Sequence, residues 1–527
     1  MYFFVKSGVV NLGLASLFSL LFLGVGAEAA GTKITVVDGP ADLSHIRLKG
    51  LLNVNAAEQG GKTGVDDDKN GFVDDVLGWN AASNNPQYMP AATLKLFQDN
   101  RDAISQIFDL YNRVELEEPE AVKSFNSLPA DSRNTVSLLL KESHGTHVSG
   151  IAALASQGTA RLQNLNIMSQ ANDLKVRLSG ALSAATVVPA TVDSLFDWHA
   201  SALSAFESLL GVQAKRSLSF FDDRTLIDAA LVPVQKRARE QSRLLARYLG
   251  ANEARVVNMS IAQSLLSTIQ LVEGIWQEEL AKANLSPKTK RTKVQQENYI
   301  YAIQGIWLAN SKKWQDIFDA LPNTLFVIAA GNDGVDLSKN PTLPAQLAKT
   351  QRNAITVAAT DQDGLITDFS NYNAEIVSLG AFGKAVISYA PGGIEGLRLS
   401  GTSMASPQVA GVATQIFEIN PDLKPADVRR ILEGTTADVG SLQGKTITGG
   451  QMSPETALDA ARRSNHVSLE DAIRTAKYYG DTPIRPMSRW AEGLSDRLPH
   501  STFREMIDTF GKVSVTSDIV KGMMRQR

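Results

Sequence analysis

The chain has 527 residues, of which 43% are hydrophobic and 20% are charged, so it can bury a large core and is not a disordered protein. Its 52 basic and 55 acidic residues give a formal net charge of −3. This balance excludes the strongly basic character expected of a protein whose main partner is nucleic acid or an anionic membrane. The chain contains no cysteine, which excludes disulfides and thiol-based mechanisms.

The first thirty residues have the pattern of a secretory signal peptide. Lys6 precedes an apolar run over residues 12–26, and Ala27-Glu28-Ala29 has the A-x-A form of a cleavage site. An uncleaved membrane anchor is the alternative, but the run is shorter than the ~20 residues of a spanning helix, and no later segment is apolar enough to span. We expect residues 1–30 to be removed and the protein to be exported, either to the periplasm or to the medium.

Runs of β-branched residues predict the main fold. They indicate buried strands at residues 33–37, 255–259, 325–330 and 354–359, with helical patterns between them. Strands that alternate with helices predict an α/β fold with a doubly wound, mostly parallel sheet flanked by helices. Ligands of such sheets bind beyond the carboxyl ends of the strands, which is where Asp38 and Asn332 would fall.

The remaining segments predict added helical structure. We expect one main domain over residues 31–465, with helical insertions at about 86–140 and 160–320, and a helical C-terminal extension over residues 466–527. We expect the tryptophans of the second insertion to lie in the core; they are Trp276, Trp307 and Trp314.

The segment GTSMASPQVAG, residues 401–411, places Ser403 among small residues at the start of a predicted helix. At that position the helix dipole and the Ser403 backbone N–H can stabilise developing negative charge. Ser403 is therefore a candidate nucleophile. The simpler interpretation of a serine before an apolar helix is an N-cap.

The segment ESHGTHVSGIAAL, residues 142–154, contains His144 and His147, three positions apart. A zinc site is one interpretation, but it needs a third ligand in a chain with six histidines and no cysteine. A neutral imidazole can accept a serine proton near neutral pH when a carboxylate fixes its tautomer, so His144 is a candidate general base. We expect the other histidines to be structural or exposed; they are His45, His147, His199, His466 and His500.

These segments together resemble the subtilisin-like serine proteases, the subtilases, whose chain order is Asp, His, Ser. VVDGPADLSH matches the aspartate segment of the family at Asp38, HGTHVSG matches the histidine segment at His144, and GTSMASPQVAG matches the serine segment at Ser403. FVIAAGNDG is similar to the segment of the oxyanion-hole amide, here Asn332. VVNMSIA is similar to the substrate-lining strand of the family and contains Ser260.

The resemblance covers about residues 33–82, 142–160, 240–262 and 323–460, and it implies a serine endopeptidase acting on proteins or peptides. In that mechanism, Asp38 orients His144, His144 deprotonates Ser403, and Ser403 forms an acyl-enzyme. One alternative is a binding or scaffold protein on a catalytically weak or inactive protease fold. Another is a different hydrolase such as a lipase, but GTSMA lacks the G-x-S-x-G elbow.

The sequence departs from the family in three places. Gly39 and Pro40 follow Asp38 where the family has a hydroxyl residue and then glycine, so one hydrogen bond to the carboxylate is expected to be missing. Ala262 stands where the family tends to have glycine, and its methyl group is expected to narrow the first specificity pocket. The expected signal peptide leaves no room before Asp38 for the pro-segment of many relatives.

The loop VDDDKNGFVDD, residues 65–75, fits the first half of a calcium loop, with Asp66, Asp68, Asn70 and then Gly71. The glutamate of position 12 is absent, because Leu77 stands there. The competing interpretation is a solvated acidic turn. We expect no required cofactor, with calcium at this loop as the candidate ion.

Overall fold

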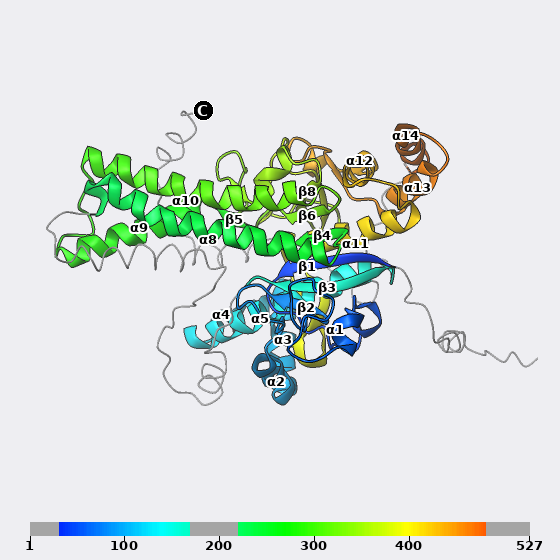
Figure 1. Cartoon of the computed structure of the whole chain (residues 1–527), viewed down its shortest axis with the longest axis horizontal. Coiled ribbons are helices and arrows are strands. Elements are labelled where there is room, and N and C mark those ends of the chain that lie inside the picture. The colour runs from blue at the N-terminus through cyan, green and yellow to red at the C-terminus, as the bar shows by residue number, and fades with distance from the viewer. Residues whose placement is uncertain (1–30, 169–219, 481–527) are drawn as a thin grey trace, which may run out of the picture. The chain divides into compact units, whose positions relative to one another are not determined.

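A computed structural model of the chain describes residues 31–168 and 220–480 (Figure 1). The expected signal peptide, His199, His500 and residues 481–527 lie outside the described residues. Within the described ranges, a nine-stranded sheet has the order β12-β13-β9-β8-β6-β4-β1-β3-β2. Its strands are β1 (Thr32–Asp38), β2 (Gly78–Asn80), β3 (Ala160–Asn166), β4 (Val256–Met259), β6 (Leu325–Ala329), β8 (Ala354–Thr360), β9 (Leu379–Phe382), β12 (Ala437–Asp438) and β13 (Gly450–Gln451).

Neighbouring strands of this sheet are parallel except for β12 and β13 at one edge. The predicted mostly parallel α/β fold is therefore confirmed. Two antiparallel ribbons lie outside the sheet: β5 (Gln263–Ser264) pairs with β7 (Thr342–Leu343), and β10 (Val386–Ala390) pairs with β11 (Ile394–Leu399).

Helices cover both faces of the sheet (Figure 1). The helices of the described ranges are α1 (Ala56–Gly60), α2 (Ala91–Asp99), α3 (Arg101–Glu115), α4 (Pro119–Asn126), α5 (Ala130–Ala155), α8 (Arg224–Ala251), α9 (Leu265–Lys282), α10 (Lys293–Ala320), α11 (Thr402–Ile419), α12 (Pro425–Gly434), α13 (Pro454–Ser464) and α14 (Leu469–Gly480). Single 3-10 turns complete the structure at η1 (Lys49–Leu51), η2 (Phe220–Asp222), η3 (Ala345–Lys349), η4 (Pro391–Gly393) and η5 (Gly440–Leu442). No described helix is both long and apolar enough to cross a membrane.

Alternating side chains of the central strands enter two separate cores. Ile34 and Val36 of β1 pack into one core with α5, α11 and α13, whereas Val37 packs into the other core with α8 and α10. Because successive residues of a strand point to opposite faces, a strand buried on both faces must be apolar at nearly every position. This two-sided burial explains the continuous β-branched runs in the sequence.

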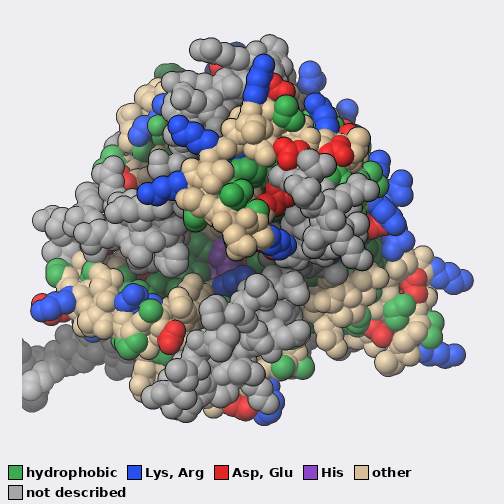
Figure 2. All heavy atoms as spheres, turned by 90° about the vertical axis from the view of Figure 1, so that its left-hand side faces the viewer, with side chains coloured by type: hydrophobic (Ala, Val, Ile, Leu, Met, Phe, Trp, Pro, Cys, Tyr) green, Lys and Arg blue, Asp and Glu red, His purple; other side chains and the backbone are tan. Residues whose placement is uncertain are grey.

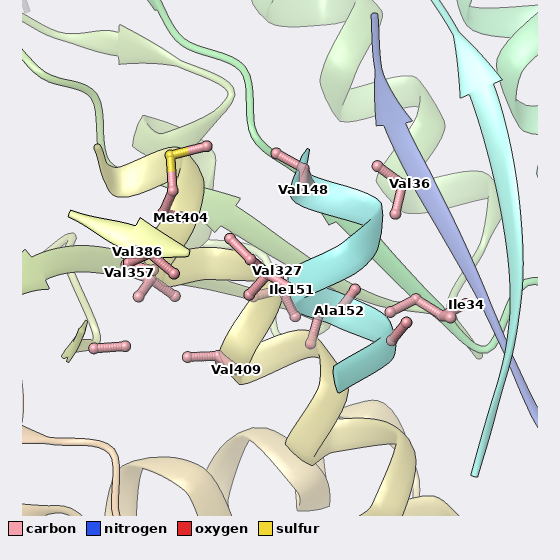
Figure 3. Close-up of a cluster of buried hydrophobic side chains, with 14 of the residues drawn as sticks. Ile34, Val36, Val148, Ile151, Ala152, Val327, Val357, Val386, Met404 and Val409 are labelled. Atoms are coloured by element: carbon pink, nitrogen blue, oxygen red, sulfur yellow. The ribbon is translucent and has the colours of Figure 1, made fainter. Parts of the chain in front are cut away.

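The first core brings α5 and α11 together. Figure 3 shows Ile151 and Ala152 of α5 among Ile34 of β1, Val327 of β6 and Val409 of α11. The two helices approach closely at Gly411, where an added Cβ would lie 2.5 Å from the Ala155 Cβ. Small residues on both helices therefore set the distance between the two helices that carry His144 and Ser403.

The two regions expected as helical insertions differ from that expectation in part. The first contains α2, α3 and α4, but its last eleven residues are the beginning of α5, which continues unbroken through His144. The second contains the sheet strands β3 and β4 as well as α8, α9 and α10. The helical pattern of this region is correct for α8, α9 and α10 and wrong for β3, a seven-residue strand that contains polar residues.

The helices α8 and α10 lie side by side and each leads directly into a strand of the sheet (Figure 1). Each has 28 residues, about 42 Å of helix, whereas the strands that follow span at most about 17 Å. Both helices therefore project beyond the carboxyl edge of the sheet, where they share a further core with α9. Trp276 and Trp314 are buried and Trp307 is half-buried, as predicted.

The C-terminal extension begins as part of the main unit. α14 packs against α12 and α13, and an added Cβ at Gly434 would meet the Ile473 side chain at 2.6 Å. Residues 469–480 are thus held by the same core as the helices before them.

Gly411→Ala is expected to lower the free energy of unfolding by about 1–3 kcal/mol, because its methyl group overfills the α5–α11 contact. Urea unfolding of purified variants measures this. Gly274→Ala is the matched control, since Gly274 also lies within a helix but has no atom within 4 Å of an added Cβ. We expect that control to match the parent or gain up to about 1 kcal/mol. Equal stability of Gly411→Ala and the parent would contradict the close contact.

Candidate active site

The strand order reverses at β1, which has β3 on one side and β4 on the other. Asp38 is the last residue of β1, and Ser260 directly follows β4. Ligands of open parallel sheets bind beyond the carboxyl ends of the strands at such a reversal. Asp38 and Ser260 therefore lie at the position where this class of fold places its ligand.

Asp38 and His144 are brought together by close backbone packing of α5 on the end of β1. His144 Nδ1 lies 2.7 Å from Asp38 Oδ1. The Asp38 side chain is fully buried, and that of His144 is 25% exposed. The next residue, Gly145, faces the turn after Asp38, and an added Cβ there would lie 2.4 Å from the Pro40 carbonyl oxygen. Glycine at this position is what allows the helix to approach.

The carboxylate changes the acidity of the imidazole. Burial lowers the pKa of His144, but the negative charge of Asp38 and its hydrogen bond favour the imidazolium and outweigh burial, so the pKa is raised above its ordinary value. The same hydrogen bond assigns the Nδ1 proton and leaves Nε2 as the basic nitrogen. His144 is thus a stronger base than a free histidine and is oriented by its partner.

Within the described ranges, one oxygen of the Asp38 carboxylate has hydrogen-bond partners and the other has none. Oδ1 accepts bonds from His144 and from the Gly39 backbone N–H, at 2.6 Å. Oδ2 is buried and has no partner among the described residues. Gly39 has no side chain that could donate to this oxygen. Asn164 of β3, which sequence reasoning missed, donates to the carbonyls of Val36 and Gly39 and holds the backbone around the carboxylate.

Ser403 is the second residue of α11 and is partly exposed. Its hydroxyl donates to the Ser260 carbonyl oxygen at 3.3 Å. The Ser260 side chain is buried, and its hydroxyl donates to the Ser403 carbonyl oxygen at 2.9 Å and meets Ser406 Oγ at 3.1 Å. The side chain of Ser260 therefore supports the start of α11 rather than lining a groove. Any contact of Ser260 with a substrate would come from its backbone.

Asn332 lies in the turn after β6, with an exposed side chain. Its Oδ1 accepts hydrogen bonds from the Thr402 backbone N–H and hydroxyl, both at 2.9 Å. Because the amide oxygen is held in this way, the amide nitrogen is left as the outward-facing donor. Thr402 also accepts a bond from the Gly331 N–H at 3.0 Å. The sequence predicts a role for Ser403, its neighbour in the GTS segment, but not the role of Thr402 in orienting Asn332.

The turn that carries Asn332 is itself organised by Asn371. The Asn371 side chain accepts from the N–H groups of Asp333 and Val335 and donates to the Ala330 carbonyl oxygen. Gly331 has φ of +102°, a conformation that favours glycine, and an added Cβ would lie 2.4 Å from Asn371 Nδ2. No sequence motif marks Asn371, because its partners are backbone groups about forty residues away along the chain.

The methyl group of Ala262 is exposed and lies across from Gly331, 3.5 Å from the position of an added Cβ there. The regular strand β4 ends before it, at Met259. The specificity pocket that Ala262 is expected to narrow would therefore lie between the residues after β4 and the turn that carries Asn332.

His147 and His45 are not part of this arrangement. His147 is fully buried and its Nε2 donates to the Leu397 carbonyl oxygen at 3.0 Å. Burial lowers the pKa of His147 to about 3, so it stays neutral. His45 is buried and stacks on Tyr389. Both lie where structural histidines were expected.

The acidic loop contains a candidate cation site. Carboxylate oxygens of Glu58, Asp66 and Asp68 all lie within 4.8 Å of one another. Glu58 was missed from sequence, since it comes from α1 rather than from the loop. Asn70 also lies in this loop: its Nδ2 donates to Asp68 and its Oδ1 accepts the Phe72 N–H.

Figure 2 shows the face that is on the left in Figure 1. Histidine surface is visible on this face, beside hydrophobic and positively charged side chains.

The chain is similar to known proteins of one family. Residues 29–450 match the model of the Subtilase family. Halolysin of Haloferax mediterranei is 38% identical over 125 residues, which are 24% of this chain and 22% of halolysin. Subtilisin-like protease 1 of Plasmodium berghei is 24% identical over 443 residues, which are 82% of this chain and 51% of that protein. The chain thus spans about a fifth and about half of the lengths of these two relatives.

Among solved structures, the crystal structure of a lanthipeptide protease is 14% identical, with a TM-score of 0.39. The match covers 81% of this chain and 88% of that one.

Gly39→Ser is expected to raise kcat/KM about two- to tenfold, because the hydroxyl can donate to the unpartnered Asp38 Oδ2. An added Cβ at Gly39 meets Met168 at an ordinary distance of 3.4 Å, so the side chain fits. Steady-state hydrolysis of a peptide anilide measures the effect. Gly39→Ala adds the same Cβ without a donor and should leave kcat/KM unchanged. An equal gain in both variants would show that the hydroxyl is not the cause.

Proposed function

Since the chain belongs to the subtilase family of serine proteases, we propose that it is a serine endopeptidase that hydrolyses peptide bonds of proteins through Asp38, His144 and Ser403. The observation that carries this proposal is the 2.7 Å hydrogen bond between His144 Nδ1 and the buried Asp38 carboxylate. It supplies an oriented base at the same sheet edge as a serine at a helix N-terminus.

In the proposed reaction, the neutral Nε2 of His144 accepts the Ser403 proton as Oγ attacks the substrate carbonyl. Asp38 stabilises the imidazolium that forms, and His144 then protonates the leaving amine. The Ser403 hydroxyl bonds to the Ser260 carbonyl in the structure, so it must rotate toward His144 before attack. Catalytic hydrogen bonds often form fully only with substrate bound. Activity requires neutral His144 and is therefore expected to rise with pH through its raised pKa.

The tetrahedral intermediate is proposed to be stabilised by Asn332 Nδ2 and the Ser403 backbone N–H. The Thr402 bonds to Asn332 Oδ1 support this role, since they fix the amide before substrate arrives. An acyl-enzyme at Ser403 is then hydrolysed by water, with His144 as the base.

We propose an extended protein or peptide segment as the substrate. The residues after β4 leave the sheet beside Ser403, and an extended peptide can pair there with their backbone. The Xanthomonas campestris relative is described as an extracellular protease, and the A-x-A pattern of residues 27–29 supports export of this chain as well.

Calcium is proposed to bind Glu58, Asp66 and Asp68. Hard carboxylate oxygens in one cluster are the donor set that Ca²⁺ prefers. Glu58 is buried and also accepts the N–H groups of Asp67 and Asp74, so it ties both ends of the loop together. A bound ion would neutralise these carboxylates and stabilise the loop; it takes no part in peptide hydrolysis.

The first test is cleavage of an unfolded, fluorescently quenched protein by the chain without residues 1–29 and by its Ser403→Ala variant. We expect fluorescence to rise with the parent and not with the variant. Asn332→Ala should lower kcat by about 10²–10³, a magnitude that comes from a subtilisin. If the folded parent cleaves no more than Ser403→Ala does, the scaffold interpretation replaces the enzyme.

Calcium at about 100 times its Kd should stabilise the folded protein by about 2.7 kcal/mol, which thermal unfolding detects as a higher Tm. Asp68→Asn should abolish most of this shift, because it removes one charged ligand. Asp363→Asn, in a separate exposed turn, is the control and should keep the shift. A shift retained by Asp68→Asn would place the ion elsewhere.

A further inference from the structure

The segment that leads into Ser403 is held by a helix from a distant part of the chain. β11 ends at Leu399, and Ser400 and Gly401 connect it to α11. The Gly401 N–H donates to the Gly383 carbonyl oxygen at 2.8 Å, and the Ser400 hydroxyl accepts the Ala385 N–H at 2.8 Å. The approach to the nucleophile therefore rests on the loop of residues 383–385.

Glu115, the last residue of α3, contacts this approach directly. Its Oε2 accepts the hydrogen bond of the Ser400 hydroxyl. The Ser400 hydroxyl is thus used twice, as acceptor from Ala385 and as donor to Glu115. A hydroxyl with both roles filled by fixed partners has one orientation, and so has the backbone that carries it.

Two further residues, one in α3 and one just after it, bind β11 and the loop of residues 383–385. The Asn112 side chain donates to the Gly396 carbonyl oxygen at 2.8 Å and accepts the Arg398 N–H at 2.7 Å, so it pairs with β11. Glu117 forms an ion pair with Lys384 at 2.9 Å, and both side chains are largely buried. α3 therefore binds both the strand before Ser400 and the loop beneath it.

The charges at this contact are balanced. Glu115 lies near Lys384, and it also acts on the buried Arg398, whose guanidinium donates to the Ala385 carbonyl oxygen at 2.9 Å. Two carboxylates thus face two cations at the base of the Ser403 segment. A partly buried hydrogen bond to a charged group is stronger than an exposed one and holds its partner more rigidly.

We infer that Glu115 is a positioning residue for Ser403, acting through Ser400. This inference rests on the proposed function, because it assigns to the helical segment between Asp38 and His144 a role in holding the nucleophile. Glu115 touches no reacting atom. Its effect is therefore on the placement of Ser403 and should appear in kcat rather than in KM.

The test compares Glu115→Ala, Glu115→Gln, Ser400→Ala and the Glu115→Ala/Ser400→Ala double variant. The readouts are kcat and KM for a peptide anilide and the rate at which a fluorophosphonate reagent labels the active-site serine. We expect about a tenfold loss in kcat and labelling for Glu115→Ala and for Ser400→Ala, with KM within about twofold. Glu115→Gln keeps an acceptor for Ser400 and should recover most of the activity.

The double variant separates positioning from general damage. If Glu115 acts through Ser400, the double variant is about as slow as either single one, whereas independent effects would multiply to about a hundredfold. Glu118→Ala is the matched control, since Glu118 pairs with Arg113 at the surface. Multiplied losses, or a raised KM with unchanged kcat, would overturn the inference. Equal labelling of parent and variants overturns this inference alone, and a parent that is not labelled overturns the proposed function as well.

Discussion

The site depends on backbone contact between α5 and the turn that follows β1. His144 can reach the carboxylate at the end of β1 only because Gly145 puts no side chain against the Gly39 and Pro40 carbonyls. The same helix meets α11 at another glycine, Gly411. One helix thus sets the distance from His144 to the Asp38 carboxylate and, through α11, from His144 to Ser403. Residues with no polar chemistry determine where the polar chemistry occurs.

A second feature of the site is how many of its groups are fixed in advance. Thr402 orients the Asn332 amide, and Asn371 holds the turn that carries it. Ser260 and Ser400 hold the backbone around Ser403. Such fixed dipoles need no reorganisation when charge develops. The exception is Asp38 Oδ2, which is buried and has no donor in the described part of the chain. A buried acceptor without a partner costs free energy, so this carboxylate is less well supported than its neighbours.

Much of this arrangement could be predicted, and the reasons for the failures are physical. Strands that are buried on both faces have continuous β-branched sequences, so the central strands and the parallel fold could be predicted. β3 was missed because it carries Gln163 and Asn164, whose side chains bond within the structure, so its sequence is not a continuous apolar run. Glu58 and Asn371 were missed for a different reason: each binds backbone groups of another segment, and such partners leave no pattern in the sequence. Ser260 was recognised, but its side chain faces α11.

By itself, the sequence determined the family and with it the chemistry proposed above, because the motifs that carry particular side chains in small-residue surroundings are local in the chain. The family order of Asp38, His144 and Ser403 followed from the same motifs. Only the tertiary structure decided what holds them, because the supporting contacts join residues that are far apart in the sequence, from about forty positions for Asn371 to 285 for Glu115 and Ser400. The hydrogen bond between Ser400 and Glu115 is such a contact. Most strands of the sheet lie between α3 and β11 in the sequence, and the two elements become adjacent only when the chain folds.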